Sequence, residues 1–481
     1  MGVVGVLIVV FIVSTVFVWL SRLYEKNHKL MNNLQSPTPL PIIGNIHQFR
    51  FRPDEFFEQA QGLAYMFRGA SERMVGVWLG PMPFVMIYGA PECEAILGGQ
   101  KTLTKLFHYK YLSPWIGDGL LIRVNALLNS FEPSSVCSKP KKWRPRRKLL
   151  TPTFHYDILK DFVQVYNRHA KTLLGKFDQL VGGGYTDIFH MITLCTLDVI
   201  CESALGYNID AQNKRTDYLD SVFRMKYIIH QRQVKPFLYP EFMFNIFGYG
   251  REQKKHVKIL HDFTSKGHDT TSAAMNWFLH LMGNNPEIQA KVQREVDEVL
   301  GDSHREVTFD DIGRFRYLEA CFKETLRLYP SVPLFAREMI ENTKINNHIV
   351  PAGTGVVIVP SMVHRDERYW PDPERFDPRA FHRQGAQTPV LLHSVLGGLE
   401  ELHWFVPYSF PAIIFSACLG QRFAMMEEKC IIAQIMRDFK VKSKLRTDQM
   451  RVAAELIIRP LYGNEIRFER RAFGDYSPIS D

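Results

Sequence analysis

The spacing of apolar and polar positions predicts short strands in three places along the chain. Residues 75–89, VGVWLGPMPFVMIYG, contain two apolar runs of β type around a Gly-Pro pair, which is typical of a hairpin. A second β region follows Thr343, where Val356–Val359 come after the turn-rich stretch PAGTG. A third lies near the end, where Glu465–Glu469 alternate polar and apolar residues. The sequence therefore predicts several small sheets.

The middle and later parts of the chain have the periodicity and the end signals of helices. Asn285 as an N-cap and Pro286 in the first turn predict a helix that runs to a stop near Gly301. A weaker capping signal, Thr308–Asp311, precedes the helical stretch YLEACFKETLRLYP, which Pro330 ends. We see no internal repeat. The fold class that these patterns predict is mainly α with smaller β-sheets (α+β).

An uncharged apolar run opens the chain. Val3–Leu20 is 18 residues long, which is enough to span a bilayer as a helix. Basic residues follow the run at Arg22, Lys26 and Lys29, and by the positive-inside rule they place the rest of the chain in the cytoplasm. A cleaved signal peptide would need a basic segment before the run and a small-residue cleavage site, and neither is evident. The alternative is a buried core helix at the N-terminus.

The stretch after the run, SPTPLPIIGN (residues 36–45), is typical of a stiff proline-rich linker that holds a soluble body off a membrane. We therefore divide the chain into a membrane anchor (residues 1–22), a linker (residues 23–50) and one large domain (residues 51–481). Within that domain, three segments are atypical beside the motifs described below: residues 122–142, 266–267 and 382–414.

Composition and charge narrow the compartment and the partners. The 481 residues are 46% hydrophobic, so the chain can bury a large core. Seven cysteines, scattered without paired spacing, indicate reduced thiols in a cytosol-facing protein rather than a disulfide framework. The net charge of +9 is densest at residues 139–148, KPKKWRPRRK, which could be a solvated face or a nucleic-acid patch. With a membrane anchor, lipid or an acidic protein is the better partner, and no nucleic acid is expected.

A single cysteine stands at a position suited to metal binding. The stretch FSACLGQRFAMMEEK (residues 415–429) places Cys418 just before a long amphipathic helix. Unpaired backbone N–H groups and the positive end of the helix dipole favour a thiolate there. Cys418 is therefore a candidate metal ligand, and the alternative is a small buried thiol that fills space.

Three charged residues form a second candidate group. Glu324 and Arg327 stand three apart in FKETLR, so they share one face of a helix and can pair. Such pairs are often surface features of little energetic value, but apolar neighbours indicate a covered helix, where both charges need further partners. Arg375, in WPDPERFDP, is the candidate third member.

A third candidate group lies in GHDTTSAAMNW (residues 267–277). Asp269 and Thr270 could cap the start of a helix, which is the structural alternative. An acid and a hydroxyl side by side can also pass protons to a bound oxygen species through water. The small residues around them would let a flat ligand lie close to the backbone.

Taken together and in this order, these segments resemble a cytochrome P450, the haem-thiolate monooxygenase family. The resemblance covers nearly the whole chain and is closest to family 4, in its insect branch. Its marks are the anchor, the proline hinge, W-x-x-x-R at Trp143 and Arg147, GHDTT, E-x-x-R at Glu324 and Arg327, PERF at residues 373–376, and C-x-G at residues 418–420. The fold implied is the cytochrome P450 fold with an N-terminal transmembrane helix.

The resemblance implies a role for each candidate residue. Cys418 would be the axial thiolate on haem iron, and Trp143 and Arg147 would hydrogen-bond a haem propionate. Asp269 and Thr270 would deliver protons during oxygen activation. The structural residues Glu324, Arg327 and Arg375 would lock the core beside the haem.

The same resemblance implies a reaction, partners and a location. One oxygen atom from O₂ would be inserted into a lipophilic substrate such as a fatty acid. An NADPH-dependent reductase would supply electrons and meet the basic surface. The expected location is the endoplasmic reticulum (microsomal) membrane, with the catalytic domain in the cytoplasm.

The chain also departs from the family pattern F-x-x-G-x-R-x-C-x-G. Ile414 stands at the glycine position and Ser416 at the arginine position, and Phe415 precedes Cys418 by three residues instead of seven. Lys266 replaces a glutamate that in family 4 can bond to haem, so no covalent link is expected. The shortened approach to GHDTT leaves the hypothesis that residues 251–266 extend that helix. The alternative function is a non-catalytic, family-derived membrane protein, or a misjoined gene product, unable to hold haem productively.

Overall fold

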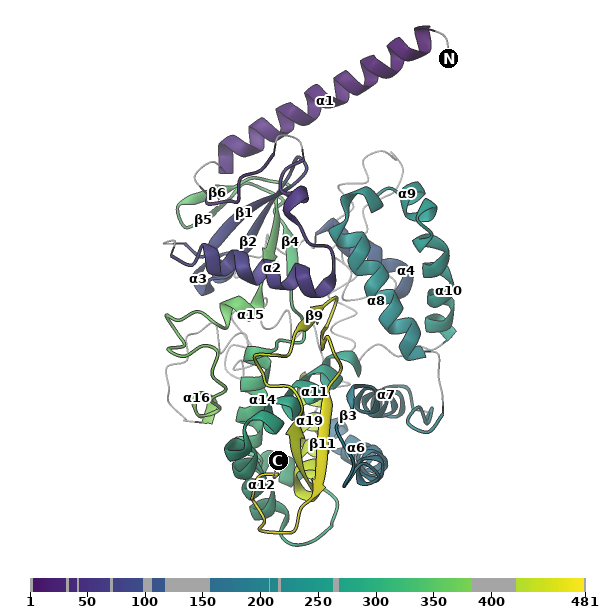
Figure 1. Cartoon of the computed structure of the whole chain (residues 1–481), viewed down its shortest axis with the longest axis vertical. Coiled ribbons are helices and arrows are strands. Elements are labelled where there is room, and N and C mark those ends of the chain that lie inside the picture. Colours follow the sequence, from purple (N-terminus) through teal and green to yellow (C-terminus); the bar gives the residue numbers. More distant parts are fainter. Residues whose placement is uncertain are drawn as a thin grey trace.

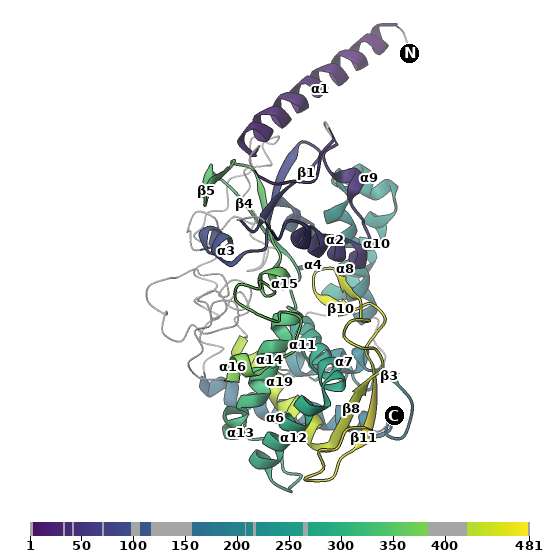
Figure 2. The same ribbon diagram turned by 60° about the vertical axis from the view of Figure 1, so that its left-hand side comes forward.

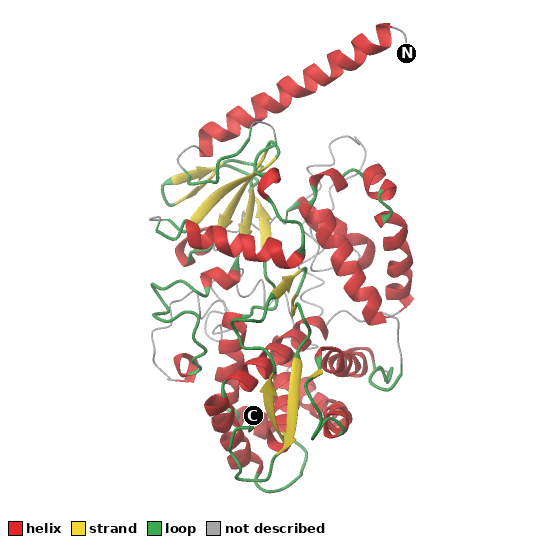
Figure 3. Ribbon diagram, viewed as in Figure 1, coloured by secondary structure: helices red, strands yellow, loops and turns green. Residues whose placement is uncertain are grey.

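The structure is a computed structural model, and Figure 1 shows a body from which one long helix, α1 (Val3–Met31), extends. Figure 3 shows a sheet-rich end next to α1 and a helix-rich end that also holds strands. The described chain is mainly helical with small sheets, as the sequence predicted. The structure describes residues 3–31, 34–40, 43–69, 72–97, 106–116, 156–206, 208–214, 218–262, 268–382 and 421–479.

The main sheet has the strand order β1-β2-β7-β4. Its first two strands, β1 (Met74–Leu79) and β2 (Met82–Ile87), form the hairpin predicted from the apolar runs, and Gly80 turns between them with φ +62°. β2 pairs in parallel with β7 (Gly355–Ile358), which pairs antiparallel with β4 (Phe335–Glu338). The sheet therefore joins the beginning of the domain to a segment far along the chain.

Smaller sheets complete the β structure. A hairpin of β5 (Thr343–Ile345) and β6 (His348–Val350) forms the other part of the predicted second β region. β11 (Glu465–Arg470), the predicted third region, lies between β3 (Thr186–Asp187) and β8 (Phe439–Ser443). The last pair is β9 (Val452–Ala454) with β10 (Ile458–Pro460).

The helices fall into groups around these sheets (Figure 1). Close to the main sheet lie η1 (Ile46–Gln48), α2 (Pro53–Met66), α3 (Ala90–Leu97) and α15 (Pro360–Val363). Beside it lie η3 (Phe107–Leu112), α4 (Ser113–Ile116), α8 (Tyr218–Val234), η7 (Pro236–Leu238), α9 (Glu241–Ile246) and α10 (Tyr249–Asp262). The helix-rich end holds α6 (Tyr156–Asp178), α7 (Phe189–Leu205), α11 (His268–Asn284), α12 (Pro286–Leu300), α13 (Phe309–Arg314), α14 (Arg316–Leu328), α16 (Arg379–His382) and α19 (Gln421–Asp438).

α1 contains the apolar run predicted to be a membrane anchor. Side chains along it such as Val4, Leu7 and Phe11 are exposed. Among the helices of the described residues, none has both the length and the apolar character of a membrane span.

The predicted linker lies against β1. Main-chain bonds join Gly76 N to Gln35 O (2.8 Å) and Asn45 N to Trp78 O (2.7 Å). The Asn45 side chain accepts a hydrogen bond from Trp78 N at 2.8 Å. The described residues of this segment are therefore docked on the body by several hydrogen bonds.

The main apolar core fills the space between α11, α14 and α19. Phe278 of α11 stacks on Phe322 of α14 with ring centroids 4.4 Å apart, and Trp277 stacks on Tyr329 at 3.9 Å. All of these rings are buried, and offset aromatic packing adds to the gain from burying their area. This core fixes α11 and α14, the two helices that carry candidate site residues.

Gly283 allows α11 to approach β8 closely. A Cβ atom at this position would stand 2.4 Å from Ser443 N, which is a main-chain atom that cannot rotate away. Gly283→Ala is therefore expected to lower the free energy of unfolding by about 1–3 kcal/mol, the usual cost of forcing extra volume into a packed contact. Denaturant unfolding of the full chain measures this. Gly62→Ala, at a helical glycine with open space around it, is the control, and an equal loss in both variants would contradict the prediction.

The two predicted helix starts have different outcomes. α12 runs from Pro286 to Leu300 with Gly301 after it at φ +70°, as predicted, but the Asn285 side chain donates to Leu281 O and does not cap the helix. Thr308–Asp311 form a complete capping box. That box begins the short α13, while YLEACFKETLRL belongs to the separate helix α14.

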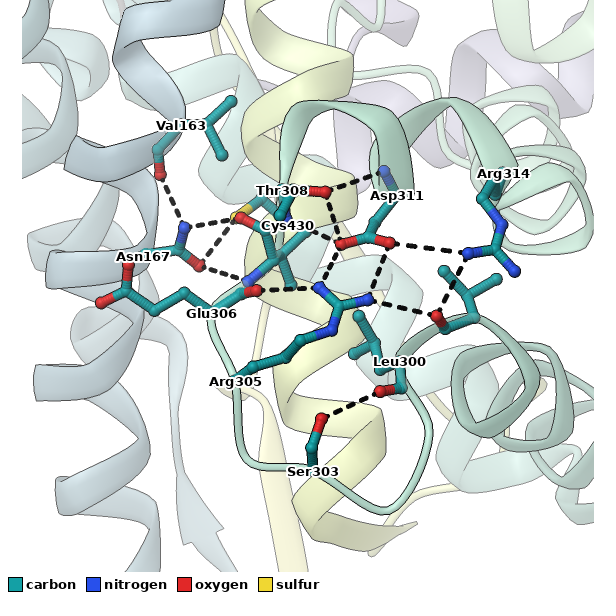
Figure 4. Close-up of polar contacts among 12 residues, drawn as sticks. Val163, Asn167, Leu300, Ser303, Arg305, Glu306, Thr308, Asp311, Arg314 and Cys430 are labelled. Carbon is teal, nitrogen blue, oxygen red and sulfur yellow. Dashed lines mark hydrogen bonds and ion pairs between the residues drawn. The ribbon is translucent and has the colours of Figure 1, made fainter.

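A polar network around this capping box ties several helices together (Figure 4). Asn167 of α6 donates to Val307 O at 2.8 Å and accepts from Gln434 of α19 at 3.0 Å. Arg305 donates to both oxygens of Asp311, at 2.5 and 2.9 Å. The loop before α13 is therefore fixed to the core by side-chain hydrogen bonds.

Asp311 should make stability depend on acid pH. Burial raises the pKa of this carboxyl, but hydrogen bonds from Arg305 and Thr308 outweigh it and lower the pKa from 3.8 to about 2. A carboxyl whose pKa is lower in the folded state than in the unfolded state stabilises the fold at pH values above its unfolded-state pKa. This stabilisation is lost as the pH falls through the folded-state pKa. Asp311→Asn is therefore expected to cost about 1–2 kcal/mol near pH 7. In chemical denaturation, the gap to the unmodified chain should narrow below pH 4, and a gap constant with pH would contradict this.

The hypothesis that residues 251–266 extend the GHDTT helix is wrong for the part described. Residues 251–262 belong to α10, which packs against α8 and α9, whereas α11 packs against α7 and β8. Figures 1 and 2 place α10 at the outside and α11 in the interior. A helix of this region therefore does not replace a missing half of α11.

The cysteines agree with a reduced protein where they are described. Cys93, Cys195, Cys201, Cys321 and Cys430 are all buried, and none forms a disulfide. Burial raises the pKa of the Cys93, Cys195 and Cys321 thiols, which keeps them protonated and unreactive.

Candidate active site

The predicted pair on α14 forms, and it is almost completely buried. Arg327 Nε lies 2.7 Å from Glu324 Oε2, and Nη2 lies 2.9 Å from Oε1. Each side chain is 1% exposed. Burial raises the pKa of the Glu324 carboxyl, and the two hydrogen bonds from Arg327 oppose that rise. This bidentate geometry is the strong form of such a pair.

Main-chain groups supply the further partners that a buried pair needs. Arg327 donates to the carbonyls of His364 (3.1 Å), Pro373 (2.7 Å) and Arg375 (3.0 Å), and Glu324 accepts from Asp377 N at 2.8 Å. The guanidinium also lies 4.5 Å from the centroid of the Trp370 ring. The pair therefore holds the loop before α16 in place.

Arg375 differs from the prediction that its side chain would join the pair. Its carbonyl accepts from Arg327, while its own side chain is exposed. The arginine in PERF therefore contributes main chain to the cluster. A main-chain contact of this kind does not depend on which side chain the residue carries, so the sequence could not predict it. The sequence pattern therefore suggested the guanidinium of Arg375 instead of its carbonyl.

Asp269 and Thr270 lie in the first turn of α11. The Asp269 carboxylate accepts a hydrogen bond from Lys226 Nζ of α8 at 2.8 Å. The Ser272 hydroxyl donates to Asp269 O (3.2 Å), and the Ser331 hydroxyl donates to Thr270 O (3.2 Å). An acid in a first helical turn is favourable, whatever chemical role Asp269 has. That its side chain caps the helix stays a prediction.

Two neighbouring acids of α19 are buried, and one of them, Glu427, is hydrogen-bonded to α11. Burial raises the pKa of Glu427 and Glu428, and a hydrogen bond from Thr271 of α11 partly opposes the rise at Glu427. Both side chains are buried. The start of α19 therefore lies against the GHDTT segment, and Gln421, its first residue, comes three positions after Cys418.

Arg337 is a buried cation that the sequence reasoning did not single out. It lies in β4, is 3% exposed, and its Nη1 donates to the adjacent carbonyl of Ala336 at 3.0 Å. Its Nε has no hydrogen-bond partner, and it forms no ion pair with any described residue. Burial lowers the pKa of its guanidinium, opposed by a hydrogen bond with Tyr109. A buried charge without a counter-ion is costly, so this site suits an anion.

Cys418, Trp143 and Arg147 lie outside the described residues, as do the atypical segments 122–142 and 266–267 and all of the segment 382–414 except His382. Within the described ranges, no three His, Cys, Asp or Glu side chains are grouped to hold a metal ion.

The class of the protein follows from comparison with known families. The family model described as Cytochrome P450 matches residues 34–266 and, in a second match, residues 257–467. The chain therefore belongs to the cytochrome P450 family, whose members use haem iron. The two matches meet at residues 257–266, next to the shortened approach to GHDTT.

Curated relatives narrow the family. "Cytochrome P450 4V2" of Mus musculus is 36% identical over 93% of this chain and 92% of its own length. The protein of the same name in Homo sapiens is 36% identical, with 90% and 88% covered. "Cytochrome P450 4c3" of Drosophila melanogaster is 30% identical, with 96% and 95% covered. The chain is thus a monooxygenase of family 4 type, while its assignment to the insect branch stays a prediction.

The residues present fit the haem of this family. Haem has anionic propionates, and Arg337 is a buried cation that lacks an acidic partner within the described chain. A guanidinium suits bidentate hydrogen bonds to such a carboxylate. No signal in the sequence marks this residue, because Glu338 directly follows Arg337 and two neighbouring charges are typical of an exposed strand position.

Proposed function

We propose that this chain inserts one oxygen atom from O₂ into a C–H bond of a lipophilic substrate such as a fatty acid. The observation that carries the proposal is Arg337, a buried cation whose lack of an acidic partner among the described residues suits a haem propionate. Two electrons from NADPH, passed on by a reductase, and two protons would convert the second oxygen atom to water. The substrate becomes an alcohol, so atoms and electrons balance.

Each candidate residue has a part in this proposal. Cys418 would supply the thiolate that binds the haem iron, and Trp143, Arg147 and Arg337 would hold the propionates. When bound, a haem iron with a thiolate ligand supplies the activation of dioxygen. The Asp269 carboxyl and the Thr270 hydroxyl, adjacent in the first turn of α11, would hold and pass the protons that this activation consumes.

The experiment uses the full chain with haem, NADPH, an NADPH-dependent reductase and dodecanoic acid under ¹⁸O₂. One ¹⁸O atom per hydroxylated product is expected, with no product when NADPH is left out. Oxygen that comes from water would overturn the proposed reaction. If the chain takes up no haem, the result would favour the non-catalytic alternative. The shortened spacing between Phe415 and Cys418 is the observation that suggests this alternative.

Asp269→Asn is expected to lower the rate of product formation by about 100-fold, the lower range for loss of a general acid. The amide keeps the size of the side chain but cannot release a proton. Product formation and NADPH use are measured together under saturating substrate. Asp310→Asn, which changes a surface acid of α13, is the control. An Asp269→Asn rate within twofold of the unmodified chain would contradict the prediction.

We also propose that the protein is attached to the endoplasmic reticulum membrane by its N-terminal helix, with the body in the cytoplasm. The uncharged run Val3–Leu20 and the basic residues after it support this. A second apolar surface lies near the same end of the molecule as α1 (Figure 1), with exposed side chains at Phe237, Phe242, Ile246 and Phe247. Lipid and exposed apolar area are complementary.

Flotation with phospholipid vesicles tests the attachment. The full chain should float and resist carbonate extraction, and a chain without residues 1–22 should be extracted. The second apolar surface predicts weaker residual binding of the shortened chain, reduced further by Phe242→Ser and Ile246→Ser together. A full chain that carbonate releases completely would overturn the proposal.

A further inference from the structure

We propose that Lys226 is the positioning residue of Asp269, and that their ion pair couples α8 to the proton-delivering start of α11. This inference rests on the proposed function. It concerns residues 43 positions apart in the chain, and no motif of the sequence connects them.

Lys226 lies at a buried position, which is unusual for a lysine. It is 5% exposed, on a helix whose neighbouring positions Val222, Met225 and Ile229 belong to an apolar cluster. Burying an ammonium group costs free energy unless it is paired and hydrogen-bonded. Its Nζ atom donates to Asp269 Oδ1 at 2.8 Å, and the Asp269 side chain is 23% exposed. The lysine therefore fixes the orientation of this carboxylate.

Further charged groups converge on the same point. Glu455, in the turn between β9 and β10, has a side chain that is 2% exposed and pairs with Arg459 at 3.4 Å. Burial raises the pKa of Glu455, while the charges of Arg459 and Lys226 lower it and the charge of Asp269 raises it. Burial raises the pKa of Tyr218, in the first turn of α8, and the charge of Asp269 raises it further. Three elements therefore meet at the pair: α8, α11 and the β9–β10 turn.

The strand that follows this turn, β10, is linked through Ser331 to Thr270, the neighbour of Asp269. Ile458 N donates to Ser331 O at 3.0 Å, and the Ser331 hydroxyl donates to Thr270 O at 3.2 Å. The main chain of Thr270 is thus held from one side while the side chain of Asp269 is held from the other. A shift of α8 would move the carboxylate and leave the Thr270 main chain in place.

Two of the ion pairs of α8 join it to two different long helices. Arg224 pairs with Glu252 of α10, Nη2 to Oε2 at 2.8 Å, and Lys226, two positions on, pairs with α11. α8 is therefore held between an outer helix and the site. Arg224 provides a matched control, because its loss removes an ion pair from the same helix without touching Asp269.

The first test uses hydrogen exchange of the full-length protein. Lys226→Met is expected to increase amide exchange in both α8 and residues 268–272, and Lys226→Arg should restore the exchange of the unmodified chain. Arg224→Met should increase exchange in α8 and α10 only. Exchange at residues 268–272 that does not change in Lys226→Met would overturn the proposal.

A double-variant cycle tests the pair directly. The unfolding equilibrium constants of Lys226→Met, Asp269→Asn and the double variant should be non-additive by at least about fivefold, within the range measured for contacting residues. The exposed pair Lys214 and Asp210, 3.6 Å apart, is the control cycle and should be nearly additive. Additivity in the Lys226 cycle would also overturn the proposal.

Turnover separates positioning from mere stability. Lys226→Met should reduce product per NADPH consumed by about threefold to tenfold, less than loss of the acid itself. Lys226→Arg should recover the ratio, and Arg224→Met should not change it. If Lys226→Met forms as much product per NADPH consumed as the unmodified chain, the lysine has only a structural role and the proposal is wrong. If the unmodified chain forms no product, the proposed function fails. Hydrogen exchange and the double-variant cycle would still show whether the ion pair couples α8 to α11.

Discussion

Cys418→Ala is expected to abolish the thiolate-type Soret band of the ferrous carbon monoxide complex and all product formation. The thiolate is the one side chain proposed to bind iron directly, and it would supply electron density to the haem iron for the activation of dioxygen. Cys418 comes three residues before α19, whose N-terminus stabilises negative charge nearby. Alanine removes the sulfur and adds nothing that could replace it. The measurement is the carbon monoxide difference spectrum of reduced, haem-loaded protein.

Cys430→Ala is the matched control for this variant. Cys430 lies on the same helix, is buried, and its Sγ contacts Asn167 Oδ1 at 3.6 Å. Its loss removes a small buried side chain and should keep the thiolate-type band. If Cys418→Ala keeps the band and Cys430→Ala loses it, the ligand assignment is wrong. A band like that of a neutral ligand in the unmodified chain would mean that the shortened loop does not present its sulfur to iron.

Arg327→Met is expected to lower the free energy of unfolding by about 3–5 kcal/mol, the cost of leaving one half of a buried ion pair. Glu324 would lose its counter-ion, and the carbonyls of His364, Pro373 and Arg375 would lose their donor. Such a loss is a large part of the stability of a typical domain, so little folded protein should remain at 37 °C. Soluble yield and urea unfolding measure it.

Two further variants make this result specific to the pair. Arg316→Met changes an exposed arginine on the same helix and should cost less than about 0.5 kcal/mol. Arg327→Lys keeps the charge but not the planar fork, so it should lie between the two. Equal stability of Arg327→Met and Arg316→Met would contradict the role assigned to the buried pair.

What the sequence could predict was local. The hairpin of residues 75–89 and the capping box at Thr308 depend on neighbours within a few positions, and both form. The contact between Glu324 and Arg327 follows from one turn of a helix. Asn285 marks the correct helix start but satisfies its side chain elsewhere, which only the surrounding packing decides.

What could not be predicted depends on contacts between distant parts of the chain. Arg337 is buried because β4 pairs with β7, and no local pattern reports that pairing. Lys226 meets Asp269 through the packing of two helices. The expectation for residues 251–266 was wrong because helical periodicity shows that a helix forms but not the direction in which it runs.

The parallel pairing of β2 with β7 has a consequence for synthesis of the protein. Residues 84–87 can pair with residues 355–358 only after those residues have been synthesised. At 5–20 residues per second, residues 355–358 leave the ribosome roughly 15–50 s later. Over that interval the apolar segment FVMI of β2 presents an unpaired edge, the kind of surface that pairs with other chains. Chaperones that shield nascent chains should therefore bind the hairpin of residues 74–87, and their depletion should aggregate this protein during translation rather than after it.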